Sequence, residues 1–155
     1  MVTGPDLRER AYAAVAAVTD PEIPVLTIAD LGVLRDVVMR GDAVEVVITP
    51  TYTGCPAMHV ITQDITAALA DAGIANVCVR TVLSPAWTTD WLSAAARRKL
   101  ADYGIAPPEP RALHPACPHC GSKDTELLSE FGSTACKALH RCRACREPFD
   151  AFKCH

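Results

Sequence analysis

Four cysteines near the end of the 155-residue sequence have the spacing of metal ligands. They form two C-x-x-C pairs, Cys117 with Cys120 and Cys142 with Cys145, which lie roughly twenty residues apart. A tight turn within each pair can point two sulfur atoms at one ion, and two such pairs make the four-cysteine pattern of a zinc ribbon. Gly121, directly after the first pair, allows the backbone conformation that completes such a turn. The spacing therefore predicts one four-cysteine site for zinc, with iron as the alternative because iron uses similar turns.

A closed set of four thiolates predicts a structural metal site. The tail of the chain has few large apolar side chains, so burial alone is not expected to fold it. Metal binding would then supply much of its folding free energy. Cys136, Cys154 and His155 lie in the same tail and are expected to be bystanders. Either of these two cysteines could replace one of the four ligands, so their role stays open.

Cys55 is the cysteine whose predicted position best suits chemistry. It lies between Gly54 and Pro56, where a helix is predicted to begin, because proline suits the first helical position. Unpaired N–H groups and the helix dipole favour a thiolate at such a place. His59 follows one helical turn later and would be the base of a thiol enzyme, but no third residue completes a triad. A small buried cysteine without a chemical role is the alternative.

Two acidic residues and one further cysteine complete the candidates. Asp20 and Glu22 lie on either side of Pro21 in the loop after the first predicted helix, and no structural role is evident for them. A plain Asp-Pro-Glu turn is the alternative. Cys78 lies in an apolar predicted strand, and we expect it in the core.

The elements that would position these residues alternate along the first hundred residues. Their order predicts an α/β (α+β) sandwich of the type α-β-β-α-β-α, in which the third strand is parallel to the second because a helix connects them. A short acidic turn is expected at Ala29–Gly32. The predicted elements are a helix over 7–18, strands over 33–40 and 43–50 around a Gly41-Asp42 turn, a helix from Pro56 to Gly73, a strand over 77–83, and a helix from about 90 to 103 that Thr88 or Thr89 caps.

Composition and charge set the domain organisation and exclude some functions. We predict a first domain over residues 1–105, a proline-rich linker over 106–111 and a small metal-binding domain over 112–155. No apolar run is long enough for a membrane span and no signal-peptide pattern is present, so we expect a cytoplasmic protein that does not contact membranes. The net charge is −5 over residues 1–110 and +2 over 111–155. Four thiolates on a divalent ion would neutralise the tail, which disfavours binding to nucleic acid.

Several motifs resemble known families. The stretches 20–24, 30–32 and 49–56, in this element order, resemble the SufT-like domain of iron–sulfur cluster assembly factors. The match is closer to the PaaD family, small proteins encoded with the phenylacetyl-CoA epoxidase of bacterial phenylacetate degradation. This second resemblance extends over essentially the whole chain. It lies in the motifs Ser84–Trp91, Gly104–Pro108, Phe131–Lys137 and Glu147–Lys153.

The resemblance implies an accessory, non-catalytic protein. Such a protein would mature or maintain an iron centre of the epoxidase, whose system contains a di-iron oxygenase and a reductase with a flavin and a [2Fe–2S] cluster. Its partners would be those subunits and iron–sulfur assembly proteins. Cys55 is the position implied to hold iron or a cluster transiently, with Asp20 and Glu22 nearby. The alternative is an electron-transfer or structural subunit with iron in the four-cysteine site; the client protein and the formation of a homo-oligomer stay open.

Overall fold

The chain folds into two compact units. A computed structural model of the protein describes residues 4–52, 55–108 and 114–153. Its contacts divide the chain into an N-terminal unit, Met1–Trp91, and a C-terminal unit, Leu92–His155. We describe each unit by itself.

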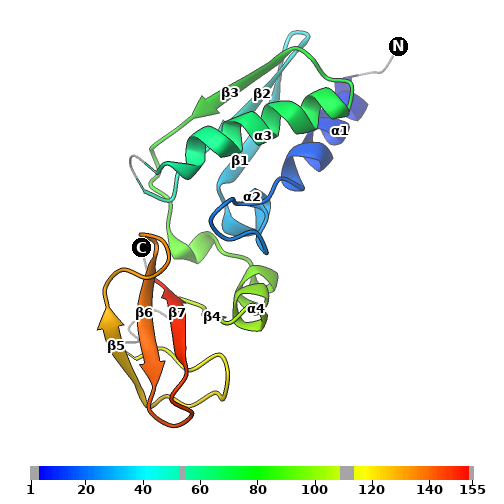
Figure 1. Ribbon diagram of the computed structural model, residues 1–155. Helices are drawn as coiled ribbons and strands as arrows, with labels where there is room; N and C mark the ends of the chain where they lie inside the picture. The colour runs from blue at the N-terminus through cyan, green and yellow to red at the C-terminus, as the bar shows by residue number, and fades with distance from the viewer. Residues whose placement is uncertain (1–3, 53–54, 109–113, 154–155) are drawn as a thin grey trace. The chain divides into compact units, whose positions relative to one another are not determined.

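A three-stranded sheet of order β1-β2-β3 forms the centre of the N-terminal unit (Figure 1). β1 (Leu34–Arg40) and β2 (Ala43–Ile48) make an antiparallel hairpin, and β3 (Val77–Thr81) is parallel to β2. Gly41 in the hairpin turn has a φ of +65°, which a two-residue turn between such strands requires. The predicted hairpin and the predicted parallel strand are therefore confirmed.

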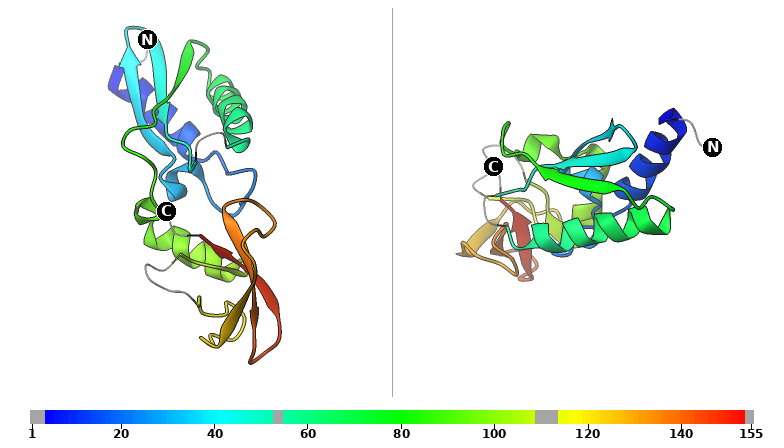
Figure 2. Two further views of the ribbon diagram at one scale, coloured as in Figure 1. Left: turned by 90° about the vertical axis from the view of Figure 1, so that its left-hand side faces the viewer. Right: turned by 90° about the horizontal axis from the view of Figure 1, so that it is seen from above.

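Two long helices cover one face of this sheet. α1 (Gly4–Ala16) and α3 (Ala57–Asp71) lie along the same side of the strands (Figures 1 and 2). Alternate residues of a strand point to the same face, and Val44, Val46 and Ile48 of β2 are fully buried. α3 begins at Ala57, one residue after the predicted start, with Pro56 as its N-cap, and it ends at Asp71, two residues before Gly73, which has a φ of +81°. α1 ends two residues before the predicted boundary.

The acidic turn expected near Asp30 is a one-turn helix, α2 (Ile28–Leu31). The Thr27 hydroxyl accepts a hydrogen bond from the Asp30 N–H at 3.0 Å, and the Thr27 N–H donates to the Asp30 carboxylate at 3.1 Å. This capping box satisfies two backbone donors at the start of a helix. Gly32 ends the helix with a φ of +78°. A single helical turn such as α2 has no apolar period, so the sequence predicts a turn there and not a helix.

The helix predicted over residues 90–103 is two separate elements. A 3₁₀ turn, η1 (Thr89–Trp91), is followed by α4 (Ala94–Asp102). Ser93, in an extended conformation, caps α4 by accepting a hydrogen bond from the Ala96 N–H at 3.0 Å. The prediction that Thr88 or Thr89 caps this helix was therefore wrong. Thr88 instead accepts a hydrogen bond from the Asp90 N–H at 3.3 Å, within the 3₁₀ turn.

The C-terminal unit is a four-stranded sheet of order β4-β7-β6-β5. α4 packs against β4, and β4 pairs in parallel with β7, so both belong to this unit. The predicted linker 106–111 consequently begins inside a strand, and the contacts divide the chain before α4 and not at residue 105. The domain limits 1–105 and 112–155 stay a prediction. The strands are β4 (Ile105–Ala106), β5 (Thr125–Ser129), β6 (Lys137–Cys142) and β7 (Pro148–Phe152).

The expectation that Cys78 lies in the core was wrong. Its side chain is exposed. β3 is one of the two edge strands of the sheet, and Cys78 pairs in register with Glu45 on the face opposite to the fully buried Val44 and Val46. Among the described residues, no helix is both long enough and apolar enough to cross a membrane.

Candidate metal centre and the cysteine at the start of α3

The structure brings the four predicted ligands of the tail together. The sulfur atoms of Cys117, Cys120, Cys142 and Cys145 all lie within 4.8 Å of one another. The Cys117–Cys145 sulfurs are 3.7 Å apart and the Cys120–Cys142 sulfurs 3.5 Å. Zinc–sulfur bonds of about 2.3 Å in a tetrahedron place the sulfurs about 3.8 Å apart. The donor set and its spacing therefore fit a tetrahedral metal ion.

The two C-x-x-C turns are built in the same way. The N–H of the first cysteine of each turn donates to a carbonyl five residues later, from Cys117 to Ser122 at 2.8 Å and from Cys142 to Glu147 at 3.0 Å. The residue after the second cysteine is left-handed in both, with a φ of +78° at Gly121 and +67° at Arg146. The first turn uses the residue that tolerates this conformation, whereas the second holds an arginine in it.

Hydrogen bonds prepare one sulfur of the cluster as a thiolate. The N–H of Cys145 donates to the Cys142 sulfur at 3.5 Å. This hydrogen bond is the main cause that lowers the pKa of the Cys142 thiol to about 6. A hydrogen bond from the Glu147 N–H likewise lowers the pKa of the Cys145 thiol. Burial and the neighbouring sulfurs raise that pKa by more, so that its value is about 12. Binding of a cation would favour the ionised form of the Cys145 thiol.

The cluster lies on a small apolar core. Cys117 and Cys142 are buried with Phe149, Ala151 and Ala106, and Cys145 packs against this group. Cys136 is also buried, but its sulfur lies 3.0 Å from the Thr134 hydroxyl and does not belong to the cluster. Cys154 and His155 lie outside the described residues.

Cys55 lies where the sequence placed it, at the entry to α3. Its N–H donates to the Tyr52 carbonyl at 3.3 Å, and its carbonyl accepts from the Met58 N–H at 3.2 Å. The side chain is partly exposed, so solvent and a partner molecule can reach the thiol. His59 is exposed on the first turn of the same helix.

Asp20 has a structural role in the turn that follows it. It is only 7% exposed, and its carboxylate accepts hydrogen bonds from the N–H groups of Glu22 at 2.7 Å and Ile23 at 2.9 Å. An aspartate that bonds the backbone two and three residues later fixes the turn that follows it. Glu22 is half-buried in this turn. The plain-turn alternative therefore describes at least part of what Asp20 does.

Among the described residues, the four-cysteine cluster is the one group of three or more His, Cys, Asp or Glu side chains that could hold an ion. Cys55, Asp20 and Glu22 do not form a second such group.

The tryptophans of the Ser84–Trp91 motif pack on α2 and the residues that follow it. The Trp87 indole N–H donates to the Leu31 carbonyl at 2.8 Å, and the Arg35 guanidinium lies 3.7 Å above the Trp91 ring. A Cβ atom at Gly32 would be 2.6 Å from the Trp91 Cβ, so only glycine fits there. More than fifty residues separate the two motifs in the sequence, so their local patterns do not predict this contact.

The C-terminal motifs Phe131–Lys137 and Glu147–Lys153 contact each other. The Ser133 hydroxyl donates to the Asp150 carboxylate at 2.8 Å, and the Lys153 ammonium lies 4.3 Å above the Phe131 ring. A side chain at Gly132 would collide with Asp150. These contacts fix the loop before β6 and hold Phe131 at 66% exposure.

The fold and the sulfur cluster define the class of protein. Residues 8–80 match the iron–sulfur cluster assembly protein family, and residues 108–153 match the PaaD zinc beta ribbon domain. The protein thus combines an assembly-type α/β domain with a zinc ribbon.

A relative that matches along most of the chain identifies the family more closely. One putative 1,2-phenylacetyl-CoA epoxidase subunit of Escherichia coli K12 is 50% identical over 149 residues, which cover 92% of this chain and 90% of the relative. The chain therefore belongs to the PaaD family. The "Fe-S protein maturation auxiliary factor YitW" of Bacillus subtilis is 36% identical over 93 residues, covering 59% of this chain and 90% of the relative.

Solved structures confirm the predicted α/β fold. A DUF59 domain from Bacillus anthracis superposes with a TM-score of 0.56 at 28% identity, covering 61% of this chain and 91% of that one. A conserved hypothetical protein from Thermotoga maritima gives 0.51 at 30% identity, with 64% and 94% covered.

Proposed function

We propose that this protein is a non-catalytic maturation factor for an iron or iron–sulfur centre of a phenylacetyl-CoA epoxidase system. It would install or maintain that centre in the oxygenase or the reductase, through contacts with those subunits and with iron–sulfur assembly proteins. The observation that carries the proposal is the joining of an iron–sulfur cluster assembly domain to a PaaD ribbon in one chain. The names of the two relatives, an epoxidase subunit and a maturation auxiliary factor, support the same combination.

Cys55 is the residue proposed to handle iron or a cluster. Its thiol is partly exposed, and among the described residues it shares no closed ligand set. A thiolate with open coordination positions can accept an ion and release it to a protein that offers more ligands. Asp20 and Glu22 are proposed to contribute at the same site, although one Asp20 oxygen also holds the backbone of its own turn.

Zinc is the metal proposed for the four-cysteine cluster. Cys117, Cys120, Cys142 and Cys145 would hold it, and a closed tetrahedral thiolate set suits a structural ion. The metal would fix the two turns to each other and so stabilise the C-terminal unit. None of the chemistry proposed for Cys55 passes through this cluster.

The proposal is tested by deleting the gene and measuring iron in the purified oxygenase and reductase. Both proteins should be present, and at least one should lack iron and activity. Wild-type protein should restore the iron, and Cys55→Ala should not. Cys78→Ala is the matched control, because it removes another exposed thiol from the same unit. Full metallation of both proteins in the deletion strain would refute the maturation role.

The second candidate is an electron-transfer or structural subunit with iron in the four-cysteine cluster. The observation that favours it is the sulfur spacing, which suits ferric iron as well as zinc. A visible spectrum of the purified protein separates the two, since ferric iron with four thiolate ligands is red and zinc is colourless. A colourless protein with one equivalent of zinc would exclude this candidate.

A further inference from the structure

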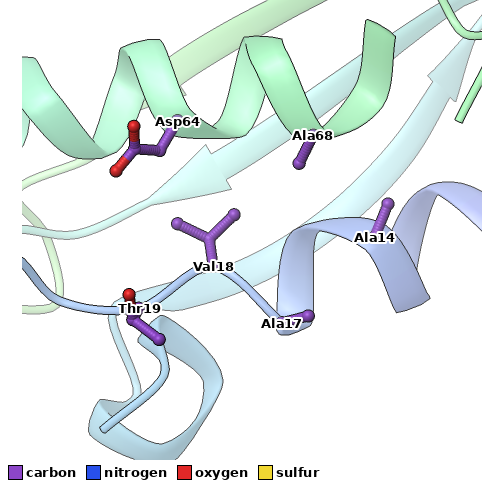
Figure 3. Close-up of a pocket in the computed structure, with 6 residues that line it drawn as sticks. All are labelled: Ala14, Ala17, Val18, Thr19, Asp64 and Ala68. Atoms are coloured by element: carbon purple, nitrogen blue, oxygen red, sulfur yellow. The ribbon is translucent and has the colours of Figure 1, made fainter. Parts of the chain in front are cut away.

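The end of α1 and the middle of α3 form an open groove of about 270 Å³. Its lining is apolar apart from the Thr19 hydroxyl and the Asp64 carboxylate. Figure 3 shows Asp64 and Ala68 projecting from α3 toward the α1 side, where Val18 projects back toward them. None of these residues takes part in the chemistry proposed for Cys55.

Two independent features make this groove favourable for a cation. Asp64 is exposed, and its carboxylate has no hydrogen bond or ion pair within the part of the chain that the structure describes. The last carbonyls of a helix lack helical partners and carry the negative end of its dipole. α1 ends at Ala16 with no basic residue in its last turn. One of its terminal carbonyls, that of Val15, accepts a hydrogen bond from the Val18 N–H at 3.1 Å.

The N-terminal unit has no cation of its own to place there. Residues 1–91 contain no lysine and only five arginines, against eleven Asp and Glu residues. All five arginines already have partners elsewhere. Arg8 binds Asp36 and the Val37 carbonyl, Arg10 the Ala72 carbonyl, Arg35 the Trp91 ring, and Arg40 and Arg80 both bind Glu45. A lysine or arginine bound in this groove would therefore come from outside this unit.

We propose that the groove is the docking site for a lysine or arginine side chain from a basic segment of a partner protein. The methylene groups would pack on Ala14, Val18 and Ala68 while the charged head meets Asp64 and the end of α1. A hard metal ion fits poorly, because it takes six or more oxygen ligands and the groove offers few. Nucleic acids and anionic membranes have the wrong sign of charge.

The test is a titration of ¹⁵N-labelled full-length protein with the peptide Ac-(Ala-Lys)3-NH2, followed by amide chemical shifts. We expect saturable shifts confined to residues 14–19 and 64–68, and binding about threefold weaker for Asp64→Asn. Ac-(Ala-Gln)3-NH2 should cause no shifts. Asp42→Asn removes one charge from the exposed hairpin turn of the same unit and should leave the affinity unchanged.

Three results would overturn the proposal. They are shifts scattered over the whole acidic surface, an equal loss of affinity in Asp42→Asn, or butylammonium chloride binding as tightly as the peptide. The last result would define a site for small amines and exclude a segment-docking site. The titration involves no iron and no epoxidase component, so its outcome is independent of the proposed maturation role.

Discussion

The two units of the protein differ in what fills their interiors. Of the twelve largest fully buried side chains among the described residues, eleven lie in the N-terminal unit and one, Leu100, lies in the C-terminal unit. The C-terminal unit instead has four sulfurs gathered over a core of small residues and one phenylalanine. We therefore expect burial to be the main stabilising contribution in the first unit and metal binding to stabilise the second.

The cysteines of the two units differ in the same way. Cys142 is buried, accepts a backbone hydrogen bond and lies against the sulfurs of three neighbours. Cys55 is partly exposed at the start of α3 and is not among the buried core residues of its unit. We therefore expect the four-cysteine cluster to be structural, and we propose Cys55 as the thiol that takes part in chemistry.

Removing one sulfur of the four-cysteine cluster should have the largest effect on stability. Cys142→Ser should abolish metal binding and unfold the C-terminal unit, because structural zinc contributes on the order of 10–16 kcal/mol in small zinc domains. The amide signals of residues 114–153 should lose their dispersion in NMR spectra while those of the N-terminal unit persist. Cys136→Ala, a buried cysteine outside the cluster, should retain the metal. A folded, metal-free Cys142→Ser protein would contradict the comparison.

A substitution that destabilises the N-terminal unit should not release the metal from the four-cysteine cluster. Gly32→Ala combines a φ of +78° with a Cβ only 2.6 Å from the Trp91 Cβ. We expect this substitution to lower the free energy of unfolding of the N-terminal unit by about 2–4 kcal/mol. Urea titration with metal analysis checks both expectations. Ala29→Gly, in the same helix, is a milder control, and metal loss in Gly32→Ala would show that the units are not independent.

Local sequence signals predicted those parts of the molecule that local chemistry determines. The cysteine spacing predicted the cluster, Gly41 and Asp42 predicted the hairpin, and Pro56 predicted the start of α3. Signals failed where the outcome depends on distant packing. Cys78 is exposed because the helices cover the other face of the sheet, and the contact of Trp91 with Gly32 joins residues far apart in the chain. The turn that Asp20 fixes also depends on how its loop closes.

The second C-x-x-C turn should become more stable when Arg146 is replaced by glycine, the residue that the first turn has at the equivalent position. Arg146 is left-handed where Gly121 stands in the first turn, and a non-glycine residue there costs about 1 kcal/mol or more. Arg146→Gly should therefore raise the free energy of unfolding of the C-terminal unit by about 1 kcal/mol in the metal-bound protein. Ala144→Gly serves as the control, since position 144 lies in the same turn and has no positive φ. A loss of stability in Arg146→Gly would mean that the arginine side chain itself stabilises the turn.

Lowering the pH should slightly reduce the free energy of unfolding of the N-terminal unit, because Glu45 becomes protonated. Hydrogen bonds from Arg80 at 2.5 Å and Arg40 at 3.0 Å lower the pKa of this carboxyl from its usual 4.5. A lowered pKa stabilises the folded state above about pH 4.5, and this stabilisation disappears as the pH falls through the folded-state value. Glu45→Gln should be less stable than wild type at pH 7, and the difference measured by urea titration should shrink below about pH 4.5. A difference independent of pH would refute the ion-pair explanation.

The central claim is a division of labour between the two kinds of cysteine. Its most direct test is anaerobic purification of wild type, Cys55→Ala and Cys78→Ala, with zinc, iron and sulfide measured in each. We expect one zinc per chain in all three proteins, and iron in wild type and Cys78→Ala that is absent from Cys55→Ala. Iron retained in Cys55→Ala, or iron in place of zinc in the four-cysteine cluster, would contradict the account.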